Sequence, residues 1–309
     1  MSVNYLLLFI ITIINLIIFN KNKKCESLFH SKIKEFDFNY TNYQNNIITP
    51  EMRNKSGWEM DENQVLFLNG IIRKYLPKNC LEIGVSQGGS SILILNAIKD
   101  IKNSFLISID LNENYYKNNS KKTGWRVKKY FSELSDKWSL YTGDQPHKFL
   151  IKLKMKYDFL FLDTAHVSPG ELFNIIEVMP FLNENAIIVL HDIIWHRSII
   201  DKKSELKAKV TPTNLNIMTF LFGDKIFLKG NENQLYNIGA IFLYKNQKSH
   251  YKEYFLSLMV IWDYMPNITQ LNDMRIFIKK YYNDDFLLEL FNEAVDFNKK
   301  FYRIHNKTY

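Results

Sequence analysis

A chain of 309 residues with 46% hydrophobic and 23% charged residues has the composition of a folded globular protein, which excludes disorder over its whole length. The formal net charge of +8 comes from dispersed lysines, with no arginine-rich run interleaved with aromatics, and this argues against nucleic-acid binding. The two cysteines, Cys25 and Cys80, have no metal-binding spacing and form no disulfide framework. The fold must therefore rest on its hydrophobic core.

The first 24 residues contain a hydrophobic segment followed by lysines. Residues 5–19 are apolar apart from Thr12 and Asn15, and counted from Val3 the segment just reaches the length of a membrane-spanning helix. The lysines in 21–24 favour a cytoplasmic body by the positive-inside rule. We therefore predict a hydrophobic helix that anchors the chain in a membrane. A cleaved signal that leads into the secretory pathway is the alternative, although the start lacks the usual positive charge.

The rest of the chain is predicted as a linker, an alternating α/β domain and an extension. Residues 25–60 lack clean periodicity and are predicted to be a linker and entry segment, and from residue 61 to 245 apolar strands alternate with helical patterns. The predicted helices cover 63–75, 89–98, 122–134, 146–154, 169–179 and 214–222. The predicted strands cover 80–85, 105–110, 138–142, 157–163, 186–190, 225–228 and 238–244.

Near-continuous apolar strands that alternate with helices are typical of a parallel sheet covered on both faces. We therefore predict a doubly wound α/β fold with a mostly parallel, seven-stranded sheet. The last two strands lie so close in sequence that they should pair as an antiparallel hairpin at one edge. Residues 246–309 carry aromatic and charged residues at helical spacing and are predicted to be a helical C-terminal extension.

A glycine-containing loop follows the first strand of this domain, where doubly wound folds bind their ligands. It runs from Glu82 through Gly84, Ser86 and Gly88 to Ser90. The two glycines let the backbone turn tightly and approach a ligand closely, and N–H groups of the following helix can bind a carboxylate. Glu82 suits a cationic ligand and would repel a pyrophosphate. Because no G-x-G-x-x-G motif is present either, the loop argues against a dinucleotide enzyme.

Two carboxylates follow the next two strands. Asp110 ends the second strand, where it can accept hydrogen bonds from both hydroxyls of a ribose, and Asp144 follows the third strand, where it can bind an adenine amino group. With the loop, these residues resemble class I S-adenosylmethionine-dependent methyltransferases over roughly residues 60–245. The alternative is a Rossmann-like domain that has lost its cofactor.

The resemblance implies a Rossmann-like methyltransferase fold with S-adenosylmethionine as cofactor. The cofactor-binding residues that it implies are Glu82, Gly84, Ser86, Gly88, Ser90, Asp110, Asp144 and Asp163.

Four residues that can carry the reaction end the fourth and fifth strands, on the same side of the sheet. Asp163 and His166 follow the fourth strand, and His191 and Asp192 end the fifth. This pairing resembles the metal-dependent O-methyltransferases and the small group related to macrolide-sugar methyltransferases and cephalosporin hydroxylases. Two positions depart from that group's pattern, because Thr164 stands for a Gly and Ser168 for a Tyr.

This second resemblance implies methylation of a hydroxyl on a sugar or another small molecule. It implies Asp163, His191 and Asp192 as ligands of a Mg²⁺-like ion, with Asp163 and His166 catalytic. A divalent ion lowers the pKa of a hydroxyl and orients it, and His166 is the candidate base that takes its proton. Without a metal, His191 could simply bond to the backbone and Asp192 cap the next turn.

Other interpretations remain open. Trp125 and the run Trp195 to Arg197 are candidates to line the substrate pocket, with ordinary packing as the alternative for Trp125. A cephalosporin-hydroxylase-like enzyme is possible, although no independent iron-binding triad of two His and a carboxylate is evident in the sequence. A membrane-tethered, non-catalytic binding module is the third possibility.

Overall fold

The computed structural model describes residues 33–35, 48–193, 213–229 and 235–305. All of them belong to one compact unit that begins at Ile33. The predicted membrane anchor in residues 1–24 and the run Trp195 to Arg197 lie outside the described residues. Among the helices of the described ranges, none combines the length and the apolar character needed to cross a membrane.

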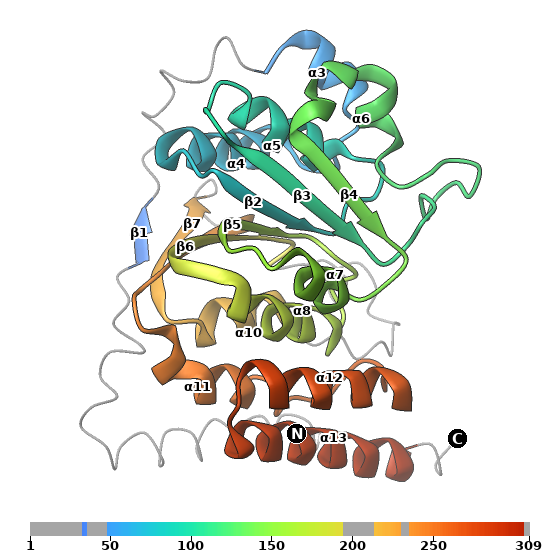
Figure 1. Ribbon diagram of the computed structural model, residues 1–309, viewed down its shortest axis with the longest axis vertical. Coiled ribbons are helices and arrows are strands. Elements are labelled where there is room, and N and C mark those ends of the chain that lie inside the picture. Colours follow the sequence, from blue (N-terminus) through green and yellow to red (C-terminus); the bar gives the residue numbers. More distant parts are fainter. Residues whose placement is uncertain (1–32, 36–47, 194–212, 230–234, 306–309) are drawn as a thin grey trace. The chain divides into compact units, whose positions relative to one another are not determined.

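One sheet of eight strands organises this unit, in the order β1-β7-β8-β6-β5-β2-β3-β4 (Figure 1). The strands are β1 (Ile33–Glu35), β2 (Asn79–Ile83), β3 (Phe105–Asp110), β4 (Trp138–Thr142), β5 (Tyr157–Leu162), β6 (Leu182–His191), β7 (Gly223–Lys229) and β8 (Leu235–Leu243). All neighbours pair in parallel except β8, which is antiparallel to β6 and to β7. This confirms the mostly parallel α/β sheet and the hairpin of the last two strands, and it adds the short β1 beside β7.

Helices cover both faces of the sheet, as Figure 1 shows for α4 and α5 on one face and α7, α8 and α10 on the other. The helices before the C-terminal extension are α3 (Pro50–Lys55), α4 (Glu62–Tyr75), α5 (Gly89–Ile98), α6 (Trp125–Tyr130), α7 (Pro146–Leu153), α8 (Gly170–Val178) and α10 (Thr213–Phe220). Successive strand residues feed two cores, because side chains alternate across a pleated strand. In β5, Leu160 packs on one side while Phe159 and Phe161 pack on the other, all fully buried.

The segment predicted as a linker, residues 25–60, contributes two elements, β1 and α3. The side chain of Thr49 caps α3 by accepting a hydrogen bond from the backbone N–H of Met52 at 3.2 Å, and Pro50 occupies the first turn. A capping box then starts α4, in which Asp61 and Gln64 each accept a hydrogen bond from the other's backbone N–H at 2.9 Å. This cap fixes the side chain of Gln64 beside the strand ends.

The C-terminal extension forms a further layer over α7 and α8, as Figure 1 shows. Its helices are α11 (Tyr251–Leu256), α12 (Ile268–Tyr281) and α13 (Asp285–His305). The ring of Trp262 lies edge-on to Phe173 of α8 at 5.5 Å, and the Tyr282 hydroxyl donates to the carbonyl of Ile176 at 2.7 Å. Burial of such aromatic rings is what holds the layer in place.

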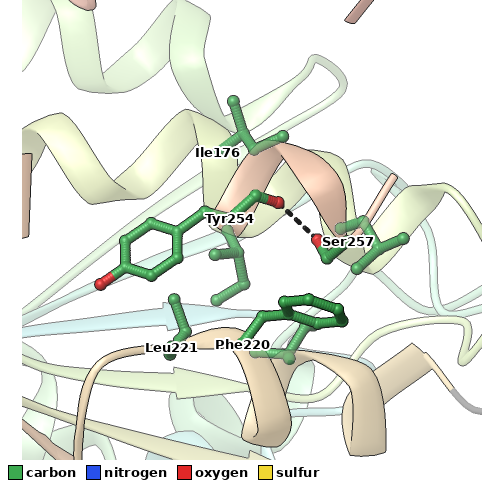
Figure 2. Close-up of a pocket in the computed structure, with 8 residues that line it drawn as sticks. Ile176, Phe220, Leu221, Tyr254 and Ser257 are labelled. Atoms are coloured by element: carbon green, nitrogen blue, oxygen red, sulfur yellow. Dashed lines mark hydrogen bonds between the residues drawn. The ribbon is translucent and has the colours of Figure 1, made fainter. Parts of the chain in front are cut away.

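A small apolar cavity lies where α11 meets α8 and α10 (Figure 2). Ile176, Phe220, Leu221 and Tyr254 contribute to its lining, and the Ser257 hydroxyl there donates to the carbonyl of Tyr254 at 2.5 Å. Its volume of about 10 Å³ is at the limit for a single water molecule. The junction of α8, α10 and α11 is therefore closely packed and has no room for a substrate.

Candidate functional site

A much larger cavity, about 690 Å³, opens at the carboxyl ends of β2, β3, β5 and β6. Its size is typical of a small-molecule site, and its place is where doubly wound sheets bind ligands. Most of its lining comes from three groups of residues: the loops after these strands, the helices α7 and α8, and a stretch of the C-terminal extension between Tyr264 and Met274. Glu59, which precedes α4, also lines it.

The loop after β2 is shaped by two glycines that no other residue could replace without strain. Gly84 has a φ of +90°, and a Cβ added there would lie 1.7 Å from the carbonyl oxygen of Asp163. Gly88, with a φ of +98°, precedes α5, and its Cβ would lie 2.9 Å from Val127. The loop therefore lies directly against the end of β5, which brings the predicted cofactor loop and Asp163 together.

Glu82 lies beneath this loop and does not line the cavity. Its buried carboxylate accepts hydrogen bonds from the hydroxyls of Ser90, Ser91 and Ser108 at 2.5–2.6 Å. Burial raises the pKa of Glu82 to about 7, although the three hydroxyls oppose the rise. Glu82 and Ser90 are predicted from the sequence to contact the cofactor directly. In the structure their side chains instead bond to each other beneath the loop.

Asp110 lines the cavity and holds the loop through backbone amides. One carboxylate oxygen accepts from the N–H groups of Val85 and Ser86 at 2.8 and 3.1 Å, and the other accepts from the N–H of Asn112 at 2.8 Å. Ser86 also lines the cavity, has a φ of +52°, and its buried hydroxyl has no hydrogen-bond partner in the protein. A bound ligand is a natural partner for that hydroxyl.

Asp144 sits outside the cavity lining. Its carboxylate accepts from the N–H of Gln145 at 2.8 Å and pairs with Lys148 at 3.2 Å, and the side chain is half-exposed. Gln145 lines the cavity instead. At the end of β4, Gln145 and not Asp144 therefore lines the cavity.

Trp125 is also absent from the cavity lining. Its ring packs on Tyr130 at 5.9 Å, with Lys121 and Arg126 over it at 5.0 and 4.8 Å. This geometry matches the packing alternative for this residue.

The four residues predicted at the ends of β5 and β6 form one cluster. His166 Nε2 lies 2.8 Å from Asp192 Oδ2 and 3.6 Å from Asp163 Oδ1, and His191 Nδ1 lies 3.2 Å from Asp163 Oδ1. His166 and Asp192 have φ values of +56° and +53°, a left-handed conformation that costs free energy outside glycine. The chain thus holds two carboxylates and two imidazoles face to face at a strained backbone.

Three residues that the sequence did not single out support this cluster. Glu171, in the first turn of α8, accepts from His166 Nδ1 at 3.0 Å, and the Asn214 amide donates to the carbonyl of His191 at 2.6 Å. Gln64 Oε1 lies 3.4 Å from His191 Nε2. A Glu in the first turn of a helix commonly interacts with the helix dipole, so its sequence position gave no signal of this role.

The charges of the cluster balance one another. Burial favours the neutral form of Asp163, but His191 and His166 outweigh it and lower the pKa of that carboxyl. Burial also disfavours a charge on His166, yet hydrogen bonds to Asp192 and Glu171 raise its pKa to about 10. The pKa of His191 is raised in the same way, mainly by Asp163, against the effect of burial. Without another cation, the raised pKa values of the two imidazoles favour their protonated forms, which offset the charge of the carboxylates.

The donor set also fits a divalent cation. Asp163, His191 and Asp192 each offer one ligand atom, and these atoms lie within 4.8 Å of one another. Because Gln64 Oε1 is an acceptor, His191 must present an N–H from Nε2 to bond to it, so its Nδ1 faces Asp163 either as a second N–H or as a lone pair. The lone-pair form needs a cation between the two groups, as in metal sites whose histidine is oriented by a second hydrogen bond.

Comparison with known proteins finds a family whose model matches part of this chain. Residues 81–193 match the family model described as a methyltransferase domain. Over residues 81–193 the chain is thus similar to methyltransferase domains. The matched range includes the loop after β2, Asp110 and the cluster at the ends of β5 and β6. A search of curated proteins finds no match.

Several solved structures resemble this chain at low identity. The O-methyltransferase of tomaymycin synthesis from Streptomyces achromogenes, solved with SAM, is 13% identical with a TM-score of 0.48, covering 63% of this chain and 90% of that one. A Bacillus cereus O-methyltransferase, solved with SAH, is 15% identical with a TM-score of 0.46, covering 66% and 96%. An SAH-bound Podospora anserina methyltransferase is 18% identical with a TM-score of 0.48, covering 70% and 99%. These likenesses are too distant to carry an argument about substrate.

Proposed function

We propose that this methyltransferase transfers the methyl group of S-adenosylmethionine to a hydroxyl of a sugar or another small molecule, with the help of a divalent metal ion. The observation that carries the proposal is the charge of the cavity. Six carboxylates and three histidines line it: Glu59, Asp110, Asp163, Glu171, Glu177, Asp192, His147, His166 and His191. No Lys or Arg is among its described lining residues, although the chain carries a net charge of +8.

Such a cavity selects cations and repels phosphates, because low-dielectric walls concentrate the field of the carboxylates. S-adenosylmethionine carries a sulfonium and an ammonium group, and both gain from that field. The free hydroxyl of Ser86 and the carboxylate edge of Asp110 offer hydrogen bonds beside the loop. The same field disfavours nucleotides and phosphorylated acceptors.

The metal is proposed at Asp163, His191 and Asp192, whose ligand atoms converge. Carboxylates suit Mg²⁺, whereas the imidazole adds preference for Mn²⁺ or another first-row ion. When bound, the ion would supply a lowered pKa and an orientation for the acceptor hydroxyl. The rest of the site then needs mainly to hold the two reactants in line.

His166 is proposed as the residue that takes the hydroxyl proton in its neutral form, which a divalent ion bound to Asp163 and Asp192 would favour by replacing the positive charge of the ring. Glu171 holds Nδ1 of its ring at 3.0 Å, so that Nε2 faces Asp163 and Asp192. A base must lie within hydrogen-bond reach of the proton that it accepts, and Nε2 is the ring atom on the side of the strand ends. Asp163 supports this role by its charge near His166 and by orienting His191, whose Nδ1 lies 3.2 Å from Asp163 Oδ1.

Calorimetry and turnover test the proposal. S-adenosylmethionine should bind the full chain without metal, and binding of Mn²⁺ or Mg²⁺ should be measurable in the same cell. Methyl transfer to a panel of sugars and phenols should stop in a chelator and return with the metal. Absence of S-adenosylmethionine binding would sink the function altogether, and full turnover in the chelator would remove the metal from it.

A cephalosporin-hydroxylase-like oxygenase is the second candidate, because the structure brings two histidines and two carboxylates together where the sequence showed no triad. His166 and His191 both approach Asp163 Oδ1, at 3.6 and 3.2 Å. This donor set resembles that of non-haem iron sites. Oxygen consumption by the Fe²⁺-loaded protein would favour this candidate. Methyl transfer without oxygen consumption would favour the proposed methyltransferase.

A further inference from the structure

We propose that His147 and Glu177 form the acceptor-binding end of the cavity and bind a protonated amine of the methyl acceptor. The inference rests on the proposed methyl transfer to a small molecule and names the class of that molecule. It gives a role to the C-terminal extension, which closes this end.

His147 and Glu177 come from different helices and meet at the cavity wall. His147 Nδ1 of α7 lies 2.8 Å from Glu177 Oε1 of α8, and the two side chains are only 6% and 1% exposed. Both residues line the cavity. The other carboxylate oxygen of Glu177 is buried and has no hydrogen-bond partner within the protein. A buried acceptor without a partner is costly, so such atoms normally meet a ligand or water.

The C-terminal extension completes this end of the site. Phe277 of α12 contacts the His147 ring at 5.3 Å, and Asp273 pairs with Lys148 of α7 at 3.0 Å. From the same extension, Tyr264, Pro266, Gln270 and Met274 line the cavity. Glu177 and these residues thus line one compartment, to which Pro266 and Met274 give apolar surface.

The lining decides the chemistry of the ligand. A carboxylate oxygen accepts hydrogen bonds, and a charged N–H donor bonds to it about twice as strongly as a neutral one. No cationic Lys or Arg lines the cavity among the described residues to neutralise Glu177 in the absence of ligand. Phe173, Tyr264 and Met274 offer flat or flexible apolar surface to a ring. The compartment thus suits a cyclic hydroxyl compound that carries an ammonium group.

Burial raises the pKa of Glu177, and the hydrogen bond from His147 opposes that rise. An ammonium group near the free oxygen would oppose it further, because an opposite charge favours the ionised carboxylate. This supports the assignment made from the geometry.

The competing explanation is that the pair only joins α7 to α8. A purely structural bridge predicts that loss of the Glu177 charge changes stability and leaves ligand preference untouched. The two explanations therefore differ in a binding preference, which can be measured directly.

The test compares two catechols that differ only in their side chain. One carries a protonated aminoethyl group and the other a hydroxyethyl group. Each is titrated into the full chain saturated with S-adenosylhomocysteine and Mn²⁺. The wild type should prefer the amine by about tenfold or more, and Glu177→Gln should reduce the preference to less than about threefold. Glu253→Gln is the matched control, because Glu253 also has an unpartnered buried oxygen but does not line the cavity.

Each outcome of the titrations supports or overturns a stated part of the proposal. An amine preference kept in Glu177→Gln, or lost equally in Glu253→Gln, overturns the role of Glu177. Equal binding of both catechols to the wild type, or binding of neither while S-adenosylhomocysteine binds, overturns the assigned ligand class. Failure to bind S-adenosylhomocysteine contradicts the proposed function instead. Thermal unfolding of both variants checks that they are folded at the temperature of the titration.

Discussion

The loop after β2 and the cluster at the ends of β5 and β6 both concentrate carboxylates, but they neutralise them differently. Glu82 and Asp110 bond to serine hydroxyls and backbone amides, which are fixed parts of the fold. Asp163 and Asp192 instead face imidazoles, whose charge depends on what else is bound. The comparison teaches that the first region is a rigid support and the second a site whose charge balance a ligand can change.

In the rigid region, the loop after β2, substitution of Gly84 should lower the stability of the protein most. In Gly84→Ala the new Cβ would overlap the carbonyl oxygen of Asp163 at 1.7 Å, and that backbone oxygen cannot move aside. We expect a loss of at least about 4 kcal/mol in the free energy of unfolding, measured by urea denaturation. Gly143→Ala is the control, because its φ of +92° is similar but the nearest atom belongs to the flexible side chain of Glu113 at 3.2 Å.

The control should lose only the cost of the left-handed backbone, about 1–2 kcal/mol. Equal losses in the two variants would show that backbone conformation alone, and not the contact with β5, makes glycine necessary at position 84.

Glu82 should make the stability of the rigid region depend on pH. Because its folded pKa of about 7 lies above the ordinary value of 4.5, the folded protein keeps a proton that the unfolded chain releases, and stability falls as pH rises from about 4.5 to 7. Between pH 5 and pH 8, the wild type should lose on the order of 2–3 kcal/mol more than Glu82→Gln. Urea unfolding of both proteins at the two pH values measures this, and parallel declines would contradict it.

Much of the fold follows from the sequence because the periodic segments are long and buried. The predicted bounds of the helix at 89–98 and of the strands at 105–110 and 138–142 agree with the structure to the residue. The three-residue strand β1 is too short to show a period, and only its pairing with β7 defines it.

The site could be predicted only where strand ends define it. Asp163 and Asp192 follow neighbouring parallel strands, so their approach is a consequence of topology. The direction of Glu82, beneath the loop, depends on which face of β2 it occupies and on three serines from other elements. Glu177 could not be recognised at all, because a Glu on a helix is usually solvated, and here it is buried near Tyr264 and Tyr282, which come much later in the chain.

In the cluster at the ends of β5 and β6, Asp192→Asn should mainly weaken metal binding. The substitution keeps the size of the side chain but removes one of the two carboxylate charges among the three candidate ligands. We expect the affinity for Mn²⁺ to fall at least about 100-fold, while S-adenosylhomocysteine binds within about threefold of the wild type. Asp144→Asn, which alters a carboxylate outside the cavity lining, should leave both affinities unchanged. Wild-type Mn²⁺ affinity in Asp192→Asn would remove this residue from the site.

Glu171→Gln should give the smallest of these effects and show how His166 is aligned within the same cluster. The variant keeps an acceptor for His166 Nδ1 but loses the charge that, after that of Asp192, raises the pKa of the ring. We expect kcat to fall about tenfold with little change in the KM for S-adenosylmethionine, because Glu171 acts through His166. The rise of kcat with pH should move to lower pH, since His166 then loses its proton more easily. Glu253→Gln, outside the cavity lining, should leave the profile in place. A lower kcat with an unmoved profile would mean that Glu171 supports the packing of α8 and not the protonation of His166.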